Sequence, residues 1–401
     1  MTDGREAVAA MAVRIVIAPD KFKGSLTAEG VAEHLARGLA AAAPDAELVR
    51  VPVADGGDGT VDAALAAGFA PVTATVTGPL GDPVPATFAV GDGHGLGAPG
   101  VRTAVVELAT ASGLGALPRD AGGRPRRDAL RATSRGTGEL VAAALDAGVR
   151  LVVLGLGGSA CTDGGTGMLA ALGVRFADAD GRALPDGGGA LGALDRVDLD
   201  GLDPRVPGTR FLLASDVDNP LLGPRGAAAV FAPQKGASPA DVAVLETGLA
   251  RWRDRLAAVR PEAAAAADTP GAGAAGGVGF AALGVLGAEA RAGIDLVLGL
   301  TNLAGLVDGA DLVITGEGSL DEQSLGGKAP VGVARLAARA GVPVVAVCGR
   351  NELSAAQAAA AGLAAVHPLT EIEPDVARCI AAPGPILETI GARIAATVGT
   401  R

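Results

Sequence analysis

Residues 13–25 read VRIVIAPDKFKGS, a continuous apolar run of strand length that passes directly into a turn with glycine and lysine. An uninterrupted apolar run is typical of a strand that is buried on both faces, as strands of parallel sheets are. Residues 27–42 follow with helical spacing of their apolar residues, and Thr27 is placed to cap that helix. This stretch therefore predicts the opening β/α unit of a parallel α/β fold.

The β/α alternation occurs at both ends of the chain and is interrupted in the middle. Before the interruption, a second strand is predicted at 46–53 and a helix at 58–67. Around residues 71–90, β-branched residues alternate about a Gly-Asp-Pro turn, which predicts a β-hairpin. The middle region then has mixed character, with further strands predicted at 103–108, 150–155 and 210–214.

After about residue 295 the alternation returns, with short strands predicted at 310–316, 342–349 and 363–369. Two strands before the interruption and three after it suit a five-stranded flavodoxin-like sheet of order 2-1-3-4-5. A chain of 401 residues is long for one domain. We therefore predict two α/β domains: a discontinuous flavodoxin-like parallel-sheet domain, 1–72 plus 293–401, and an inserted mixed α/β domain, 73–292.

The composition limits the classes of ligand. Apolar residues make up 49% of the chain and charged residues 19%, which is typical of a globular protein with an ample core. Aromatic residues are only 2%, whereas proteins that bind single-stranded nucleic acid need aromatic faces for stacking. The formal net charge of −11 also repels a polyanionic backbone. The predicted partners are therefore small molecules and not nucleic acid.

The sequence shows no thiolate zinc site, export signal or membrane span. The three cysteines form no C-x-x-C pair, and no histidine stands in a metal-ligand or triad motif. Residues 1–12 contain acidic groups and lack the long apolar core of a signal peptide. The uncharged run at 269–288 has the length of a bilayer crossing, but its glycines and proline favour a loop and a tightly packed turn. We therefore predict a cytoplasmic protein that does not bind membranes.

Five polar, glycine-containing loops follow directly from apolar strands. Open α/β sheets bind ligands beyond the carboxyl ends of their strands, so these loops form the candidate site. Loops so placed in both domains would face one another across a cleft. The loops are APDKFKGS (18–25), ADGGDGT (54–60), GLGGSACTDGG (155–165), ASDVDNPLLG (214–223) and TGEGSLDEQS (315–324).

The charged residues of these loops indicate phosphoryl transfer. Only four of the 33 basic residues are lysine, and all four lie in or beside glycine-containing loops: Lys21, Lys23, Lys235 and Lys328. Lysine supplies a compact charge suited to phosphate or carboxylate oxygens. Carboxylates beside glycine turns suit Mg²⁺ that also binds phosphate and water, and backbone N–H groups ahead of a helix suit a phosphate. Neither a Walker sequence nor the protein-kinase loop set occurs.

The ordered set of motifs resembles the bacterial type I glycerate kinases, from about Val13 to Val398. The resemblance implies ATP- and Mg²⁺-dependent phosphorylation of D-glycerate, most often to 2-phosphoglycerate, by two α/β domains of which one is flavodoxin-like and split by the other. Relatives commonly have Ser where Lys21 stands and Asn or Thr near Cys161, which disfavours both as catalytic residues. The matching segments are APDKFKGSLTA, PVADGGDGT, ATSRGTGEL (132–140), GLGGSACTDGGTGM, SDVDNPLLG, FAPQKGA (231–237), GAAGGVGF (273–280) and TGEGSLDEQSLGGKAPVGVA.

We hypothesise that ATP and glycerate meet in an interdomain cleft, whose closure excludes water, for in-line phosphoryl transfer. The expected catalytic residues are Asp163 or Asp216, which would orient the attacking hydroxyl, together with Lys23 and Lys235. The expected substrate ligands are Lys23, Ser25, Asp55 and Arg135. The expected phosphate or ATP ligands are Gly157, Gly158, Ser159, Gly316, Gly318 and Lys328. The expected Mg²⁺ ligands are Asp58, Glu317 and Asp321, with Asp55 as a further candidate.

Two other functions remain open on the sequence alone: a kinase of another small hydroxy acid, and a non-catalytic sensor that binds a nucleotide or sugar acid in the same cleft. A dinucleotide dehydrogenase is disfavoured, because no G-x-G-x-x-G opens a helix after the first strand. The sequence is compatible with a homo-oligomer. Its chemistry does not select the 2-hydroxyl over the 3-hydroxyl, and it gives no role to residues 1–12.

Overall fold

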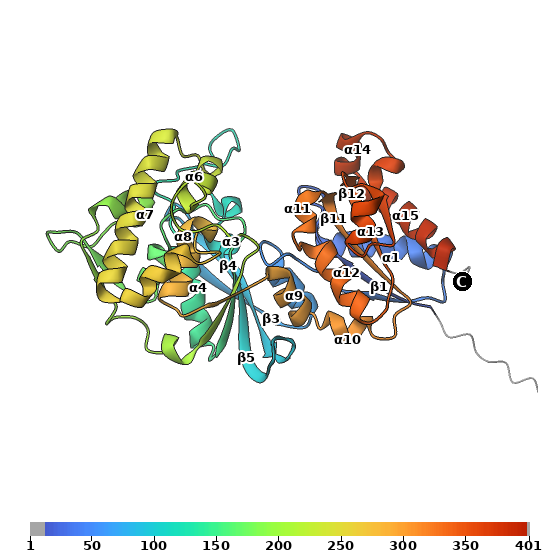
Figure 1. Cartoon of the computed structure of the whole chain (residues 1–401), viewed down its shortest axis with the longest axis horizontal. Coiled ribbons are helices and arrows are strands. Elements are labelled where there is room, and N and C mark those ends of the chain that lie inside the picture. The colour runs from blue at the N-terminus through green and yellow to red at the C-terminus, as the bar shows by residue number, and fades with distance from the viewer. Residues whose placement is uncertain (1–12, 399–401) are drawn as a thin grey trace, which may run out of the picture. The chain divides into compact units, whose positions relative to one another are not determined.

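The computed structural model describes residues 13–398, so the segment in which no signal peptide is expected lies outside the described range. The chain forms two compact units (Figure 1). The first unit contains the chain up to Val53 and again from Asn302 onward, and the second unit contains Ala54–Thr301.

The predicted boundaries lie after residue 72 and before residue 293. The observed second unit extends further at both ends because it includes two helices. Helix α2 (Thr60–Ala66) and helix α9 (Gly293–Leu300) pack on the sheet of the second unit. Val61 and Leu296 from these helices belong to a core cluster with residues of that sheet. Both helices therefore belong to the second unit.

The first unit contains a five-stranded, fully parallel sheet of order β13-β12-β11-β1-β2. Counted along the chain within this unit, the order is 2-1-3-4-5, which confirms the flavodoxin-like prediction. The central pairing places Ile17 of β1 opposite Ile314 of β11. The strands are β1 (Arg14–Pro19), β2 (Glu47–Arg50), β11 (Leu312–Leu320), β12 (Val344–Asn351) and β13 (Ala365–Pro368).

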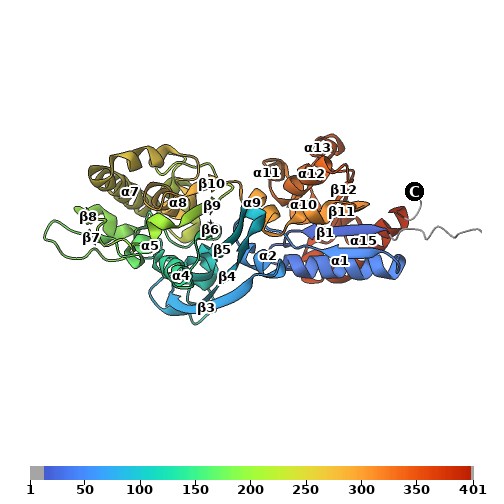
Figure 2. The same cartoon turned by 90° about the horizontal axis from the view of Figure 1, so that it is seen from below.

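Helices cover both faces of this sheet, with α1 and α15 on one face and α12 on the other (Figure 2). The side chain of Thr27 accepts a hydrogen bond from the Gly30 N–H, so this residue caps α1 as predicted. The helices of the first unit are α1 (Ala28–Ala42), α10 (Leu303–Val307), α11 (Glu322–Leu325), α12 (Ala329–Arg339), α13 (Ala355–Ala360), α14 (Val376–Ala381) and α15 (Pro383–Val398).

The second unit contains a six-stranded mixed sheet of order β10-β9-β6-β5-β4-β3. The first four of these strands run parallel, and β3 and β4 form the predicted antiparallel hairpin. The strands are β3 (Ala70–Thr77), β4 (Pro83–Gly93), β5 (Ala98–Glu107), β6 (Leu151–Gly155), β9 (Arg210–Ala214) and β10 (Glu289–Arg291), and β7 (Arg175–Ala177) with β8 (Arg196–Asp198) forms a separate hairpin.

The larger core of the second unit lies on the face of the sheet opposite α2 and α9. At its centre, the ring of Trp252 meets Phe176 and Phe280 edge-on, with centroid distances of 5.3 Å and 5.9 Å. Figure 1 shows α4, α7 and α8 on this side. The helices here are α3 (Leu108–Ser112), α4 (Arg135–Asp146), α5 (Thr166–Ala171), α6 (Ala227–Phe231), α7 (Pro239–Val259) and α8 (Ala274–Gly284).

The uncharged run at 269–288 begins with a turn, and Ala275, Gly276 and Gly277 inside α8 have non-helical, left-handed backbone angles. The rest of α8 is helical, so the interpretation of the run as a loop and a turn is wrong for its second half. Residues 278–282 of α8 are fully enclosed by the larger core, which supports a helix despite the glycines. Within residues 13–398, no helix is both long and apolar enough to span a bilayer. Short 3-10 helices complete the fold: η1 (His94–Leu96), η2 (Leu114–Ala116), η3 (Gly188–Ala193), η4 (Val206–Gly208), η5 (Pro233–Lys235), η6 (Pro261–Asp268) and η7 (Leu369–Glu371).

Candidate active site

In the first unit, the lysine loop after β1 lies against the carboxyl-terminal half of β11. Pro19 pairs with Gly316, and the Asp20 N–H donates to the Gly316 carbonyl at 2.8 Å. A Cβ atom built on Gly318 would lie 3.4 Å from the backbone nitrogen of Lys23. The sheet order therefore brings Lys23, Gly316 and Gly318 together, at the switch point where such sheets bind ligands.

The side chain of Lys23 is exposed and forms no hydrogen bond or ion pair with the described residues. Nearby, the Ser25 hydroxyl donates to the carbonyl of Ile380 at 2.5 Å, which ties the loop to α14. The loop is thus anchored to α14, and the ammonium group of Lys23 is available to an anionic ligand.

Strand β11 and the segment that follows it contain three further predicted site residues. Glu317 is buried within β11. Asp321 caps α11, because its carboxylate accepts hydrogen bonds from the N–H groups of Gln323 and Ser324. Lys328 is half-buried directly before α12, and its Nζ lies 3.3 Å from the side-chain oxygen of Gln323. One short segment therefore places two carboxylates and an ammonium group near the start of a helix.

In the second unit, three glycine loops meet at the carboxyl ends of the parallel strands. A Cβ atom on Gly157 would lie only 2.6 Å from the Cα of Gly57, and one on Gly56 would lie 2.3 Å from the Cα of Gly293. These backbones are too close for any side chain, so the glycines are required by packing. Asp216 joins the same cluster, because its carboxylate accepts a hydrogen bond from the Gly293 N–H at 2.9 Å.

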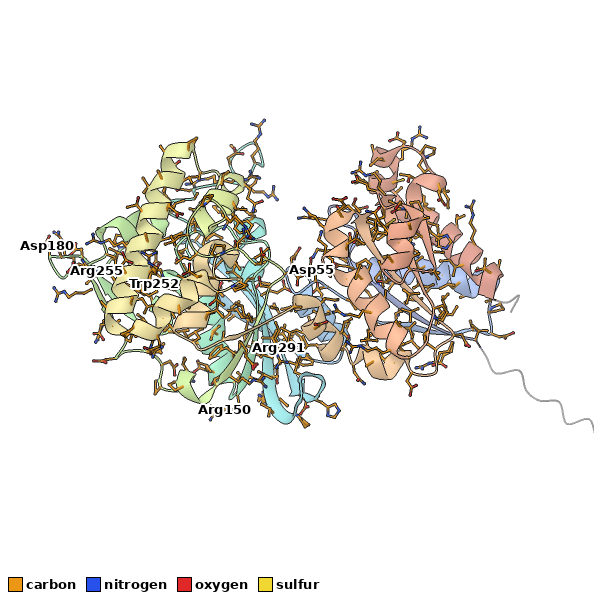
Figure 3. The ribbon with its side chains drawn as sticks, viewed as in Figure 1. Asp55, Arg150, Asp180, Trp252, Arg255 and Arg291 are labelled. Atoms are coloured by element: carbon orange, nitrogen blue, oxygen red, sulfur yellow. The ribbon has the colours of Figure 1, made fainter. Side chains whose placement is uncertain are left out.

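The acidic residues of loop 54–60 differ in their environment. Asp55, labelled in Figure 3, is half-buried and accepts a hydrogen bond from the Gly57 N–H at 3.3 Å. Asp58 is exposed on the same loop. Asp55 therefore shapes the turn, whereas Asp58 is the more exposed of the two acidic residues.

The loop after β6 offers backbone donors. The N–H groups of Gly157 and Gly158 have no acceptor among residues 13–398, and both residues reach the surface. The carbonyl of Gly158 accepts from the Leu114 N–H at 2.8 Å, and Ser159, which is 8% exposed, pairs with Gly113. The loop is therefore anchored on one side while its N–H groups point to no protein acceptor, as a phosphate-binding turn requires.

Asp163 is fully enclosed beneath this loop and is held by a ring of donors. Its carboxylate accepts hydrogen bonds from the N–H and the hydroxyl of Ser134, both at 2.8 Å, and from the N–H groups of Gly165 at 3.1 Å and Gly167 at 3.3 Å. Burial raises the pKa of Asp163, and these hydrogen bonds oppose that shift. Trp252, labelled in Figure 3, supports the same turn through a 3.0 Å hydrogen bond to the Gly164 carbonyl.

Lys235 is also enclosed, with 1% of its surface exposed. Its Nζ donates to the carbonyl of Cys161 at 2.5 Å. Burial lowers the pKa of Lys235, and the charge of nearby Asp163 opposes this shift. Asp163 and Lys235 thus hold the 157–165 loop in place from within, and the catalytic contacts predicted for them stay a prediction.

The guanidinium of Arg135 is already paired with a carboxylate. It forms a bidentate contact with the carboxylate of Asp186, with hydrogen bonds of 2.5 Å and 2.8 Å. This contact raises the pKa of Arg135. A substrate anion would have to compete with Asp186 for this group. The predicted substrate contact of Arg135 stays a prediction.

Glu107, which ends β5 and is 4% exposed, is a buried acidic residue that was not predicted from the sequence. Its carboxylate accepts a hydrogen bond from the Val61 N–H at 2.5 Å, and it lies beside Gly155, on which a Cβ atom would be 3.6 Å from the Glu107 side chain. Burial, together with the charges of Asp58 and Asp62, raises the pKa of Glu107 to about 7. The available signal is the acidic residue that closes the apolar run TAVVE (103–107).

The described part of the chain contains no group of three or more His, Cys, Asp or Glu side chains that could hold a metal ion. Asp58 lies in the second unit, whereas Glu317 and Asp321 lie in the first. Each unit therefore offers one or two carboxylates, which fits a Mg²⁺ ion bound mainly by phosphate and water, and does not fit an all-protein metal cage.

Known proteins share this architecture over nearly the whole chain. A family model described as "Glycerate kinase family" matches residues 15–399. The chain is 46% identical over 339 residues to the glycerate kinase of Bacillus subtilis, covering 84% of this chain and 85% of the relative. It is 45% identical over 340 residues to the glycerate 2-kinase of Escherichia coli, with coverage of 84% and 85%. A crystal structure described as glycerate kinase 2 from Salmonella typhimurium LT2 matches with a TM-score of 0.81 and 40% identity, over 97% of this chain and 99% of that one.

Proposed function

Because this chain belongs to the glycerate kinase family, we propose that it transfers the γ-phosphoryl group of ATP to D-glycerate and releases 2-phosphoglycerate. Membership of this family supports phosphorylation of glycerate as the reaction. The choice of the 2-hydroxyl is supported by the 45% identity to a glycerate 2-kinase. The choice of ATP is supported by the phosphate-binding character of the loops.

The observation that carries the proposal is the pair of N–H groups at Gly157 and Gly158, at the end of β6, which have no acceptor among residues 13–398. Adjacent N–H groups in a turn form an anion-binding concavity, and they need no reorganisation when charge develops on a phosphoryl group. The buried side chains of Asp163 and Lys235, each through its own hydrogen bonds, fix this turn before the ligand arrives.

We assign different roles to the two candidate carboxylates. Asp216 is exposed and is oriented by the hydrogen bond from the Gly293 N–H, so it is suited to touch and orient the attacking hydroxyl. Asp163 is enclosed on all sides and acts by positioning the phosphate-binding turn. In a loose phosphoryl-transfer transition state the base chiefly positions the hydroxyl, which is the role assigned to Asp216.

Lys23 and Lys328 are proposed to bind the anions of the reaction. Lys23 would hold the glycerate carboxylate or the transferred phosphoryl group, with Ser25 and the backbone at Gly318 beside it. Lys328, at the start of α12, would neutralise nucleotide phosphate together with the N-terminus of this eleven-residue helix. Mg²⁺ would enter with the nucleotide and reach Asp58, Glu317 or Asp321, and when bound it supplies positive charge to the phosphate oxygens. The interdomain location of the reaction and the cytoplasmic location of the protein stay predictions.

Phosphorus-31 NMR of the product made from D-glycerate, ATP and Mg²⁺ tests the proposal. The phosphate of 2-phosphoglycerate couples to one proton and gives a doublet, whereas that of 3-phosphoglycerate couples to two protons and gives a triplet. We expect the doublet, together with formation of ADP. A triplet would contradict the assigned hydroxyl, and consumption of glycerate without ADP would contradict the assigned donor. Faster turnover of another hydroxy acid would support the alternative substrate, and nucleotide binding without turnover would support a sensor.

A further inference from the structure

Residues 119–131, RDAGGRPRRDALR, form a cationic segment in a protein whose net charge is −11. We call these residues the arginine segment. It contains five arginines and only two aspartates. All five arginines are exposed, and the side chain of one of them, Arg119, donates a hydrogen bond to the Gly123 carbonyl at 2.7 Å. A local excess of positive charge against the charge of the whole molecule is the signature of an anion-binding surface.

The arginines of this segment form no ion pair within the part of the chain that the structure describes. Elsewhere in the same unit, arginines are commonly paired, for example Arg175 with Asp198 at 2.6 Å and Arg210 with Glu289 at 2.6 Å. A few other exposed arginines are also without ion pairs, but in the arginine segment such residues are clustered, which leaves several neighbouring guanidinium groups available to an external anion.

The two aspartates of the segment shape its backbone. Asp120 accepts hydrogen bonds from the N–H groups of Gly122 and Arg124, both at 2.9 Å, and Asp128 accepts from the Arg131 N–H at 3.1 Å. Two backbone hydrogen bonds, Asp120 to Arg124 at 2.9 Å and Arg126 to Pro118 at 2.8 Å, close a short hairpin. The exposed arginines therefore stand on a defined turn.

The arginine segment is attached to the proposed phosphate-binding turn at two places. The residues that lead into it bind that turn, through the 2.8 Å hydrogen bond from Leu114 to Gly158 and the pairing of Gly113 with Ser159. At the other place, a Cβ atom on Gly236, which follows the buried Lys235, would lie 2.8 Å from the Cβ of Arg127. The segment is thus fixed both to the loop after β6 and to the loop that carries Lys235.

From this charge, exposure and attachment, we propose that the arginine segment is an anion-binding arm that captures the polyphosphate of a nucleoside triphosphate beside the 157–159 turn. The identification of the nucleotide as ATP rests on the proposed function. A triphosphate carries several negative charges and glycerate carries one, so the Coulomb attraction of a cluster of exposed guanidinium groups favours the nucleotide. The arm supplies affinity and encounter rate, whereas the chemical step depends on the enclosed residues.

The test is a triple variant, Arg124→Gln with Arg126→Gln and Arg127→Gln, compared with a control that removes the same charge elsewhere. The control combines Arg102→Gln, Arg150→Gln and Arg196→Gln, which are exposed arginines without ion pairs among the described residues. Arg150, labelled in Figure 3, precedes β6 and donates its N–H to the Arg102 carbonyl at 2.9 Å, so both lie toward the amino end of that strand, away from the site. Arg196 lies in the separate hairpin.

Calorimetric titration with ATP and Mg²⁺ at low and at high salt gives the readout. At low salt we expect the arm variant to bind ATP about tenfold more weakly than the wild type, and the difference to shrink at high salt because exposed charges are screened. The control variant should bind as the wild type does. In the arm variant, kcat at saturating ATP and the KM for glycerate should stay within about twofold of the wild type, whereas a charge-preserving triple Arg→Lys variant should recover most of the affinity.

Equal ATP affinity in the arm variant and the wild type would overturn the inference, and so would a rise in the KM for glycerate alone. Weaker ATP binding in the control as well would show that only the net charge matters, which also overturns it. The two proposals fail separately. Salt-dependent ATP binding through the arm in a protein that does not phosphorylate glycerate would contradict the proposed function only. Normal kinase activity with an unchanged ATP affinity in the arm variant would contradict the arm only.

Discussion

Lys235 and Lys23 are the same residue type in opposite settings. In the second unit, Lys235 is enclosed by protein and donates to the carbonyl of Cys161 near the enclosed Asp163. In the first unit, Lys23 is exposed on its loop and has no protein partner among the described residues. A buried charge is stabilised by its internal partners, so its removal affects folding and loop geometry together. An exposed, unpaired charge contributes very little to folding stability, so its removal should affect only the binding and turnover of the ligand.

The largest effect is expected from Asp163→Asn, because it removes the charge and turns an amide N–H₂ group toward a ring of N–H and O–H donors. The free energy of unfolding should fall by about 3–5 kcal/mol, and kcat should fall by at least about 100-fold. Urea denaturation and a coupled assay for ADP measure the two effects. The double variant with Lys235→Met should lose less stability than the sum of the single variants, because it removes both buried charges. Near-normal stability and turnover in Asp163→Asn would break the comparison.

Lys23→Ala is the complementary test on the exposed side. We expect kcat/KM for glycerate to fall about 100- to 1,000-fold, because a charge that contacts the transferred or substrate anion is lost. The melting temperature should stay the same within error, as Lys23 has no partner to lose among the described residues. Lys21→Ala, two residues earlier, serves as the matched control and should cost less than about tenfold. A large loss of stability in Lys23→Ala would show that this lysine is structural.

Glu107 adds a test by pH, since it is a buried carboxyl whose hydrogen bond comes from a neutral backbone N–H. Its pKa is raised from 4.5 to about 7, so the folded state keeps a proton that the unfolded state has released. Its contribution to stability is full below about pH 4.5 and is lost as the pH rises through about 7. A shift of one pKa unit corresponds to about 1.36 kcal/mol, so the loss of stability from this shift amounts to about 3 kcal/mol.

The variant Glu107→Gln cannot titrate, so its stability relative to the wild type should be about 3 kcal/mol more favourable at pH 8 than at pH 4. Urea denaturation at both pH values measures this difference. The same variant should be less active at pH 8, because the charged acceptor that fixes the Val61 N–H beside loop 54–60 is lost. A relative stability that does not change with pH would contradict the raised pKa.

Lys328 lies between the two extremes, since it is half-buried and has one hydrogen bond of 3.3 Å, to Gln323. Lys328→Met keeps much of the apolar packing and removes the charge. We expect the KM for ATP to rise about tenfold, with the unfolding free energy changed by less than about 1 kcal/mol. Steady-state kinetics at varied ATP measures the first effect. Gln323→Ala should leave the KM for ATP unchanged, and an equal rise in that variant would indicate that the hydrogen bond matters more than the charge.

The sheet order of the first unit could be predicted because its strands are short apolar runs and right-handed crossovers leave few ways to connect them. The domain boundaries could not be located in the same way. Helix α2 follows β2 after a short loop and looks like the next β/α repeat, but its apolar residues Val61 and Ala64 cover the other sheet. Periodicity shows that a helix has an apolar face, and it does not show which sheet that face covers.

The sequence also located the loops of the site better than it located the environment of single residues. The Lys23 loop follows β1, and β1 pairs with β11, so the approach of Lys23 to Gly318 of β11 followed from topology. The enclosure of Lys235 did not, because a lysine in a glycine loop resembles a surface residue until the partner at Cys161, 74 positions away, is known. Glu107 was missed because it follows an apolar strand without glycine or lysine to mark the turn.

The chain contains one tryptophan and no tyrosine, and that tryptophan donates a hydrogen bond to Gly164. Near-ultraviolet excitation therefore reports on a single indole, directly under the turn that holds Asp163. Its emission provides an intrinsic optical sensor of this turn, with no added dye. A change in the emission spectrum on adding ADP would report movement of that turn. Stopped-flow fluorescence could then follow the rate of this ligand-induced rearrangement.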